Sequence, residues 1–205
     1  MRKDVVFLVA DSTMEFTIKG LLDRRESLGV RALQTKIYTH PGHDPGCLRE
    51  AADFLRPFAG DYVHAVVLFD REGCGQEDIP CEKLEALCES RLSSTGWQDR
   101  AAAVVIDPEL EVWAWSDSPH VDSALGWAGR TPKLREWLVQ EGFHLGVRGK
   151  PEKPKEALHN ALRVARRPIS SSIYRELAST VGFERCQDRA FLRFRQILRK
   201  WFPAA

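Results

Sequence analysis

The chain has 205 residues, of which 43% are hydrophobic, and its formal net charge is +1. This composition excludes a disordered or fibrous chain and favours one sizeable hydrophobic core. The longest apolar runs, Val5–Ala10 and Ala101–Ile106, are too short to cross a bilayer, and the first predicts a strand rather than a signal peptide. We therefore expect a cytoplasmic protein with no membrane partner.

Five cysteines, an odd number without a CxxC pair, favour reduced thiols in a cytosolic compartment. Cys74, Cys81 and Cys88 lie seven positions apart in the sequence, so a zinc site is the less favoured alternative interpretation. Tetrahedral zinc sites rarely use that spacing.

Four β-rich apolar runs alternate with helical patterns in the first half of the chain, which is typical of a mostly parallel sheet. The predicted strands are Val5–Ala10, Arg31–Tyr38, His64–Phe69 and Ala101–Ile106. The predicted helices between them are Met14–Leu22, Leu48–Phe58 and Glu82–Ser93.

After residue 116 the pattern becomes helical, and no internal repeat is present. A Gly/Pro/Lys-rich loop is expected at Gly146–Lys155. The predicted helices are Leu134–Glu141, Lys155–Arg166, Ser170–Val181 and Asp188–Trp201.

The balance of charged residues also differs between the two halves of the chain. Residues 1–129 carry 13 Lys/Arg against 22 Asp/Glu, and residues 130–205 carry 17 against 7. We expect an acidic α/β core at 1–129 and a basic, mainly helical extension at 130–205 that packs on the same domain. A polyanion-binding face is predicted from five basic residues: Lys150, Lys155, Arg163, Arg166 and Arg167. The alternative is that these side chains neutralise the acidic half internally.

Acidic residues follow three of the four predicted strands, at the edge of an open α/β sheet where ligands usually bind. They are Asp11 and Glu15, then Asp70 and Glu72, then Asp107, Glu109 and Glu111. Converging carboxylates repel one another unless a cation lies between them, and two or three such groups commonly hold Mg²⁺. The sequence therefore predicts a Mg²⁺ (or Mn²⁺) site, with a free carboxylate available for proton transfer.

Three features of the sequence together resemble the Toprim family. They are a Glu near the first strand–helix junction, an acidic pair before Gly73 that follows an apolar strand, and the later segment Glu111-Val-Trp113. The chain is similar to compact Toprim-like proteins of prokaryotic defence loci, including the RloB-like and OLD-nuclease-like groups and the small Toprim-like subunit of methylation-associated systems. The resemblance runs from Val5 to Phe202 and includes Lys150-Pro-x-Lys-Pro-Lys and Asp188–Phe194. It implies a Toprim-like four-stranded sheet flanked by helices.

The resemblance also implies roles for single residues. Glu15 matches the general acid/base, Asp70 and Glu72 match the metal-binding and catalytic pair, and Glu111 matches a later acidic residue of the metal site. Glu72 stands where Asp is usual in the family, and its side chain reaches about one methylene further. From this spacing we expect Glu111, and not Glu109, to belong to the site.

Three further residues are candidate accessory groups. His40 and His43 lie in a turn-rich loop beside the expected site, and Arg71 lies between the two acids, where it is suited to orient a phosphate. No Walker loop is present, so a partner ATPase or another defence subunit would supply nucleotide energy.

These observations predict a divalent-metal-dependent nuclease subunit of an anti-phage system, acting on DNA or RNA. The rival hypothesis is a non-catalytic scaffold that binds nucleic acid or a partner ATPase. Nucleotidyl transfer, which uses the same acids, is less favoured because no nucleotide-binding motif accompanies them.

Overall fold

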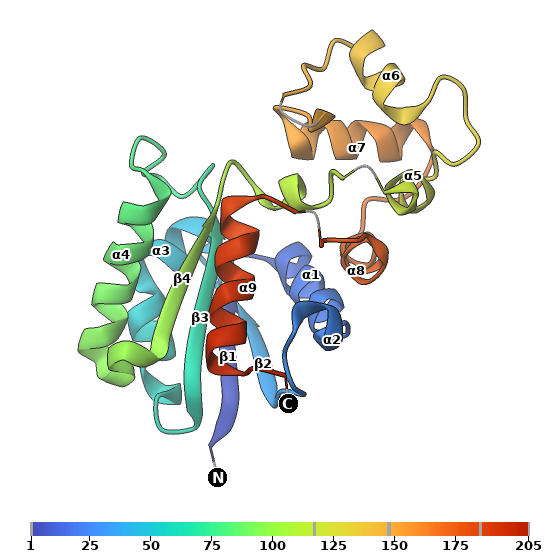
Figure 1. Ribbon diagram of the computed structural model, residues 1–205. Helices are drawn as coiled ribbons and strands as arrows, with labels where there is room; N and C mark the ends of the chain where they lie inside the picture. The colour runs from blue at the N-terminus through green and yellow to red at the C-terminus, as the bar shows by residue number, and fades with distance from the viewer. Residues whose placement is uncertain (1, 117, 147–148, 185, 205) are drawn as a thin grey trace.

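The computed structural model describes residues 2–116, 118–146, 149–184 and 186–204. Its centre is a four-stranded sheet in the order β2-β1-β3-β4, in which every neighbouring pair is parallel (Figure 1). The predicted α/β class, with a four-stranded sheet flanked by helices and a helical C-terminal extension, is confirmed. The sheet is wholly parallel rather than mostly so.

The strands are β1 (Lys3–Val9), β2 (Thr35–Thr39), β3 (Tyr62–Asp70) and β4 (Ala101–Ile106). β2 is shorter than its predicted range, because the residues before Thr35 bind Asp4 instead of forming a ladder. Arg31 donates to the Asp4 carboxylate at 2.6 Å, and the Gln34 N–H donates to it at 2.7 Å.

The helices of the first half cover both faces of the sheet. They are α1 (Ser12–Leu22), α2 (Arg25–Leu28), α3 (His43–Leu55) and α4 (Cys81–Leu92). α3 begins five residues before its predicted start, since the ring of His40 accepts a hydrogen bond from Gly42 N–H and closes the preceding turn directly into the helix. A Cβ at Gly46 would overlap that ring, so the turn requires glycine there.

The second half contributes α5 (Pro119–Ala124), α6 (Leu134–Gln140), α7 (Pro154–Val164), α8 (Ser171–Thr180) and α9 (Arg189–Trp201). α5, α6 and α7 lie beyond the carboxyl ends of the strands, whereas α9 returns to the sheet beside α1 (Figure 1). The rings of Phe194 and Phe7, 6.4 Å apart, join α9 to β1. In the described residues no helix is both long and apolar enough to cross a membrane.

The charge asymmetry of the sequence is in part neutralised inside the fold. Arg175 of α8 pairs with Asp23 at 2.7 Å, and Arg189 and Arg193 of α9 both pair with Glu85 of α4. Arg175, Arg189 and Arg193 therefore use part of the basic surplus after residue 129 to join the two halves.

Candidate functional site

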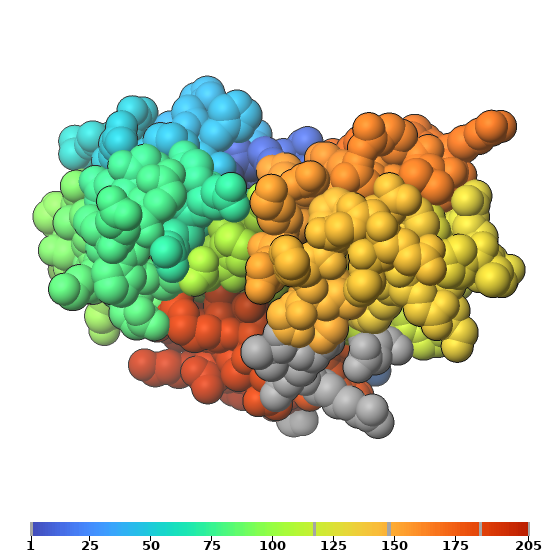
Figure 2. Space-filling view, turned by 90° about the horizontal axis from the view of Figure 1, so that it is seen from above, coloured from blue at the N-terminus to red at the C-terminus, as the bar shows by residue number. Residues whose placement is uncertain are grey.

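The acidic residues converge at the carboxyl ends of the strands, under the lobe formed by α5–α7. β1 and β3 are neighbours, so Asp11, which caps α1, and Asp70, which ends β3, lie at adjacent strand ends. Seen from above in Figure 2, the lobe lies beside the blue and green core. We call Asp11, Asp44, Asp70, Glu109 and Glu111 the acidic cluster.

Asp70 is the most strongly perturbed member of the acidic cluster. Its side chain is 8% exposed, and no hydrogen-bond partner for its Oδ1 exists among the described residues. Burial, together with the nearby charges of Asp44 and Glu111, raises the pKa of Asp70 well above its usual range. Asp44 itself accepts a hydrogen bond from the Asp70 N–H at 2.8 Å, which fixes the first turn of α3 against the end of β3.

Glu111 is 2% exposed and lies in the short 3-10 helix η4 (Leu110–Trp113). Its Oε1 accepts a hydrogen bond of 2.6 Å from the Tyr174 hydroxyl, while its Oε2 is a second buried carboxylate oxygen without a partner in the described part of the chain. Burial and the Glu111 carboxylate raise the pKa of Tyr174, so this tyrosine acts as a neutral donor.

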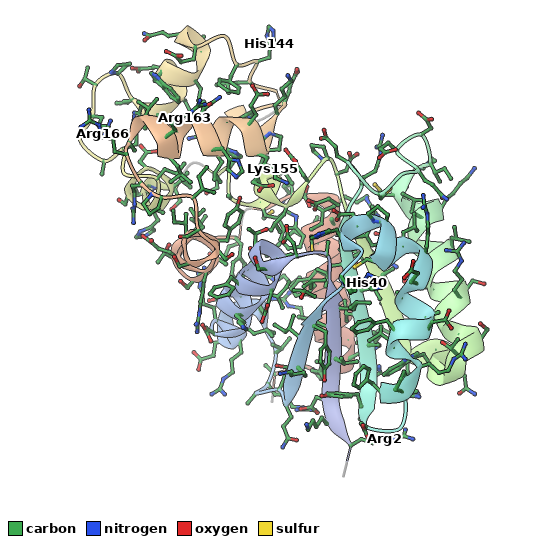
Figure 3. All side chains as sticks on the ribbon, turned by 180° about the vertical axis from the view of Figure 1, so that it is seen from behind. Arg2, His40, His144, Lys155, Arg163 and Arg166 are labelled. Atoms are coloured by element: carbon green, nitrogen blue, oxygen red, sulfur yellow. The ribbon has the colours of Figure 1, made fainter. Side chains whose placement is uncertain are left out.

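Lys155 brings positive charge to the acidic cluster from the first turn of α7 (Figure 3). Burial is the largest single influence and acts to lower the pKa of Lys155. The pKa is nevertheless raised, because Glu111, Glu109, Asp70 and Asp11 together outweigh that effect. The ammonium lies 3.9 Å from Glu109, and the Lys155 N–H donates to the same carboxylate at 3.0 Å.

Glu109 belongs to the acidic cluster together with Glu111, and the expectation that Glu111 but not Glu109 is part of the metal site stays a prediction. Glu109 is extended just before η4 and Glu111 lies within it, and both carboxylates face Lys155. Burial, Glu111 and Glu72 raise the pKa of Glu109. The hydrogen bond from Lys155 N–H also gives Glu109 a structural role at the start of α7.

The structure brings together two of the four predicted metal ligands, Asp70 and Glu111. Glu15 lies in the first turn of α1 and pairs with Lys19 at 2.6 Å. Glu72 is exposed, and its N–H donates to the Pro108 carbonyl. Within the described ranges, no group of three or more His, Cys, Asp or Glu side chains is arranged to hold a metal ion, which also leaves the zinc alternative without a site.

A metal site with two carboxylates nevertheless fits the chemistry of these residues. Asp70 Oδ1 and Glu111 Oε2 are buried, and neither has a donor among the described residues. The negative charges of the two carboxylates favour a cation between them. Mg²⁺ is usually held by one or two carboxylates, with water and substrate phosphate completing its shell. The residues therefore fit Mg²⁺ at Asp70 and Glu111, and not in the predicted set of four.

The three candidate accessory residues have structural partners. His40 is buried within the turn before α3, and burial lowers its pKa. His43 is exposed, with its Nδ1 3.2 Å from the Ala10 carbonyl. Arg71 donates to Asp107 at 2.9 Å and to the Glu77 carbonyl, which ties it to the loop after β3.

The five predicted nucleic-acid-binding residues occupy different environments. Lys155 faces the acidic cluster, and Lys150 donates to the Val112 carbonyl at 2.8 Å. Arg167 donates to the Ser123 and Ala124 carbonyls, which ties the end of α7 to α5. Arg163 and Arg166 are exposed on the lobe, toward the end of α7 opposite Lys155 (Figure 3).

Sequence reasoning overlooked Tyr174. Asp44 lies in the turn-rich loop that also holds His40 and His43, and its carboxylate enters the cluster because α3 starts at His43. Tyr174 was one apolar position of a predicted helix, and nothing in that helix indicates that its hydroxyl reaches Glu111, 63 residues away.

Comparison of the chain with protein-family models, curated proteins and solved structures finds no match.

Proposed function

We propose that this protein is a divalent-metal-dependent hydrolase of phosphodiester bonds in nucleic acid. The observation that carries the proposal is the pair of buried, unpartnered carboxylate oxygens, Asp70 Oδ1 and Glu111 Oε2, beside the Lys155 ammonium. Leaving such groups unpaired is costly, and natural sites accept that cost where a cation or ligand completes them.

In this proposal Asp70 and Glu111 would hold Mg²⁺ or Mn²⁺, and the ion would supply charge stabilisation to the phosphoryl and leaving oxygens. Tyr174 orients Glu111 through its hydroxyl. Lys155 attracts the phosphate, since its ammonium keeps a raised pKa in the acidic cluster. The Toprim resemblance implies that Glu15 is the general acid/base. To take up a proton from a substrate or water, the Glu15 carboxylate would have to separate from Lys19, with which it forms an ion pair.

The same resemblance supports a role as the nuclease subunit of an anti-phage system. A partner ATPase or another subunit would then provide activation, and the nucleic acid would contact the exposed arginines of the lobe. A cytoplasmic location remains a prediction from composition and cysteine content.

A non-catalytic scaffold is the second candidate, and one observation favours it. No three-ligand metal group exists in the described part of the chain, and Lys155 already provides a counter-charge to the acidic cluster. Such a protein would bind nucleic acid or an ATPase while another subunit cuts.

The decisive experiment incubates the purified protein with single-stranded DNA, duplex DNA and RNA in Mg²⁺, Mn²⁺ or EDTA. We expect metal-dependent cleavage that is lost in Asp70→Asn and in Glu111→Gln. Glu26→Gln, a change at an exposed carboxylate of α2, is the matched control and should cleave normally. Binding without cleavage in every metal would support the scaffold instead.

A further inference from the structure

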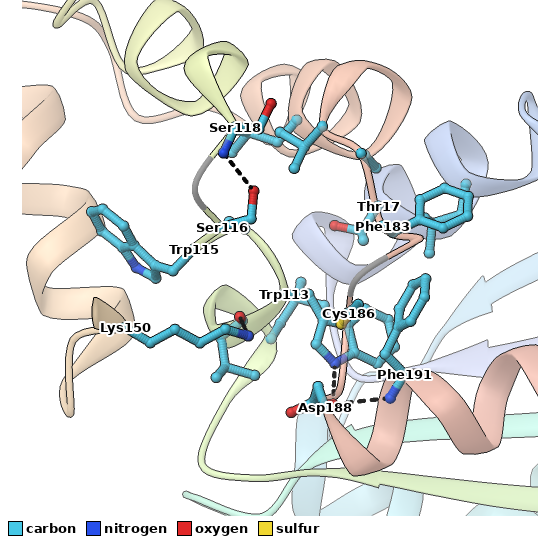
Figure 4. A pocket seen from close by; sticks show the side chains of 18 of the residues that line it. Thr17, Trp113, Trp115, Ser116, Ser118, Lys150, Phe183, Cys186, Asp188 and Phe191 are labelled. Carbon is cyan, nitrogen blue, oxygen red and sulfur yellow. Dashed lines mark hydrogen bonds between the residues drawn. The ribbon is translucent and has the colours of Figure 1, made fainter. Parts of the chain in front are cut away.

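A groove of about 1100 Å³ lies beside the acidic cluster, between η4, α1, α8 and the start of α9 (Figure 4). This volume is slightly above the roughly 300–1000 Å³ typical of small-molecule sites. Aromatic rings supply much of the wall, from Trp113, Phe183 and Phe191. The groove is therefore large enough for planar ligands longer than one ring.

The groove and the acidic cluster share a wall. The ring of Tyr174 lines the groove while its hydroxyl donates to Glu111. Leu110 and Val112, the neighbours of Glu111 in η4, also line the groove. A ligand lying in the groove would consequently contact Leu110 and Val112, the residues on either side of Glu111 in the sequence.

The rim of the groove carries charges of both signs, the Lys150 ammonium and the carboxylates of Glu184 and Asp188, so Lys150 is the group there that suits an anionic part of a ligand. Lys150 uses one of its three donor hydrogens on the Val112 carbonyl and places its positive charge at the groove. Asp188 accepts hydrogen bonds from the Trp113 indole N–H at 2.8 Å and from the Phe191 N–H at 2.9 Å, which fixes the indole (Figure 4). Gln187, also in the wall, offers an amide that can pair with the edge of a base.

We propose that this groove binds unpaired bases of a single-stranded nucleic acid whose backbone runs past the acidic cluster. The inference rests on the proposed function and specifies its substrate. Aromatic walls with an adjacent cation are the elements with which proteins bind single strands without sequence preference. Bases inside a duplex are stacked on one another, so a duplex does not present them to such walls.

Gly182 allows the groove to be narrowed with little risk to the fold. It is exposed, lines the groove, and a Cβ built there meets no atom within 4 Å. Gly60, just before β3, has the same open surroundings and is not part of the groove. Gly182→Trp is therefore the test variant and Gly60→Trp its matched control.

The measurement is fluorescence anisotropy with labelled single-stranded and duplex oligonucleotides of equal length, in EDTA to prevent cleavage. We expect the single strand to bind the wild type at least tenfold more tightly than the duplex. Gly182→Trp should weaken single-strand binding roughly tenfold, about the loss of one stacked base, and leave duplex binding unchanged. Equal binding of both forms, or equal loss of both in Gly182→Trp, would overturn the proposal.

Cys186 gives a second readout in the unmodified protein. It lines the groove and is half-buried, whereas the other four cysteines are buried. Single-stranded oligonucleotide should slow the reaction of Cys186 with a thiol reagent, and Cys186→Ser should remove that reaction. An unchanged reaction rate with saturating single strand would contradict occupancy of the groove.

The hydrolase proposal and the groove proposal can be refuted independently of each other. Single-strand protection of Cys186 without cleavage in any metal would remove the hydrolase and keep the groove. Metal-dependent cleavage of duplex at an undiminished rate in Gly182→Trp, with no single-strand preference, would keep the hydrolase and remove the groove.

Discussion

The carboxylate of Glu85, on α4, accepts a hydrogen bond of 3.0 Å from the backbone N–H of Val105, on the outer edge of β4. Arg189 of α9 completes the pair, because its guanidinium donates to the Val105 carbonyl and to both oxygens of Glu85. A carboxylate and a guanidinium thus take the places that the carbonyl and N–H of a neighbouring strand would occupy. Unpaired edges invite association with other chains, so this arrangement protects the sheet.

The same arrangement recurs two residues earlier on β4. Glu89 accepts from the Ala103 N–H at 2.9 Å, and Arg193 donates to the Ala103 carbonyl at 2.9 Å. Arg193 also donates to Glu89 at 2.6 Å. The two Glu–Arg pairs therefore repeat with the two-residue period of a strand.

Removal of Glu85 should destabilise the protein more than removal of Glu89. The Glu85 side chain is only 3% exposed, so Glu85→Ala leaves Arg189 and the Val105 N–H without their buried partner, at a cost of about 3 kcal/mol. Glu89 is more exposed, and Glu89→Ala should cost about 1 kcal/mol. Urea unfolding midpoints measure both, and equal losses of stability would show that burial of Glu85 does not matter.

Tyr174→Phe tests the hydrogen bond that orients Glu111. Loss of the hydroxyl leaves both oxygens of a buried carboxylate unpaired, which should lower the free energy of unfolding by about 1–3 kcal/mol. Metal affinity should also fall if Glu111 needs this orientation. Tyr38→Phe, a change in a ring stacked on Phe58, is the control, and the double variant Tyr174→Phe/Glu111→Gln should lose less than the sum of its parts.

Asp70→Asn should stabilise the metal-free protein near neutral pH. The pKa of Asp70 is raised in the folded state by burial, Asp44 and Glu111, so between the unfolded and folded pKa values the native state binds more protons. Stability therefore falls as pH rises through that window, and the asparagine removes this loss. Thermal unfolding from pH 4 to 8 in EDTA measures the effect. Mg²⁺ should raise the Tm of the wild type and not that of the variant.

His64 should make the protein less stable in mild acid. Its ring stacks on Trp201 at 4.0 Å, and its pKa is lowered by burial and by the charge of Arg100. The unfolded chain then takes up a proton near pH 6.5 before the folded one does, so stability is full above that pH and is lost as pH falls toward the folded pKa. Denaturant unfolding at pH 7.5 and 5.5 should show a smaller difference for His64→Phe than for the wild type. Identical differences would exclude His64 as a source.

Arg163 and Arg166 should contribute to nucleic-acid affinity, whereas Arg167 should contribute to stability. The first two are exposed, and each phosphate interaction that Arg163→Gln or Arg166→Gln removes should flatten the plot of log affinity against log salt by about 0.7–0.9. Arg167→Gln removes hydrogen bonds to the Ser123 and Ala124 carbonyls and should lower the Tm. A salt slope that none of the three changes would show that the lobe does not bind the backbone.

Local sequence was sufficient for the sheet and for most helices. The runs at Val5 and Ala101 predicted β1 and β4 because strands buried on both faces need continuous apolar residues, and all four predicted strands exist. The adjacency of β1 and β3, which brings Asp11 and Asp70 to neighbouring strand ends, followed from the topology of parallel sheets. Asp70 was thus expected near Asp11 from the sequence alone, whereas Glu111 was singled out by the Toprim resemblance, and a metal-binding role for Asp70 and Glu111 stays a prediction.

Tertiary structure alone decided which charges meet. The pair of Glu15 and Lys19 is an exception, because helix spacing alone places the two side chains within reach, and the expected place of Glu15 at a metal stays a prediction. Lys155 was expected on an outer basic face. Its side chain is 46% exposed, but its backbone N–H donates to Glu109 and its ammonium lies 3.9 Å from the same carboxylate. Composition and periodicity determine which side chains are buried, because burial follows local pattern. They carry no information on which distant side chain, such as Tyr174 for Glu111, packing brings to each buried charge.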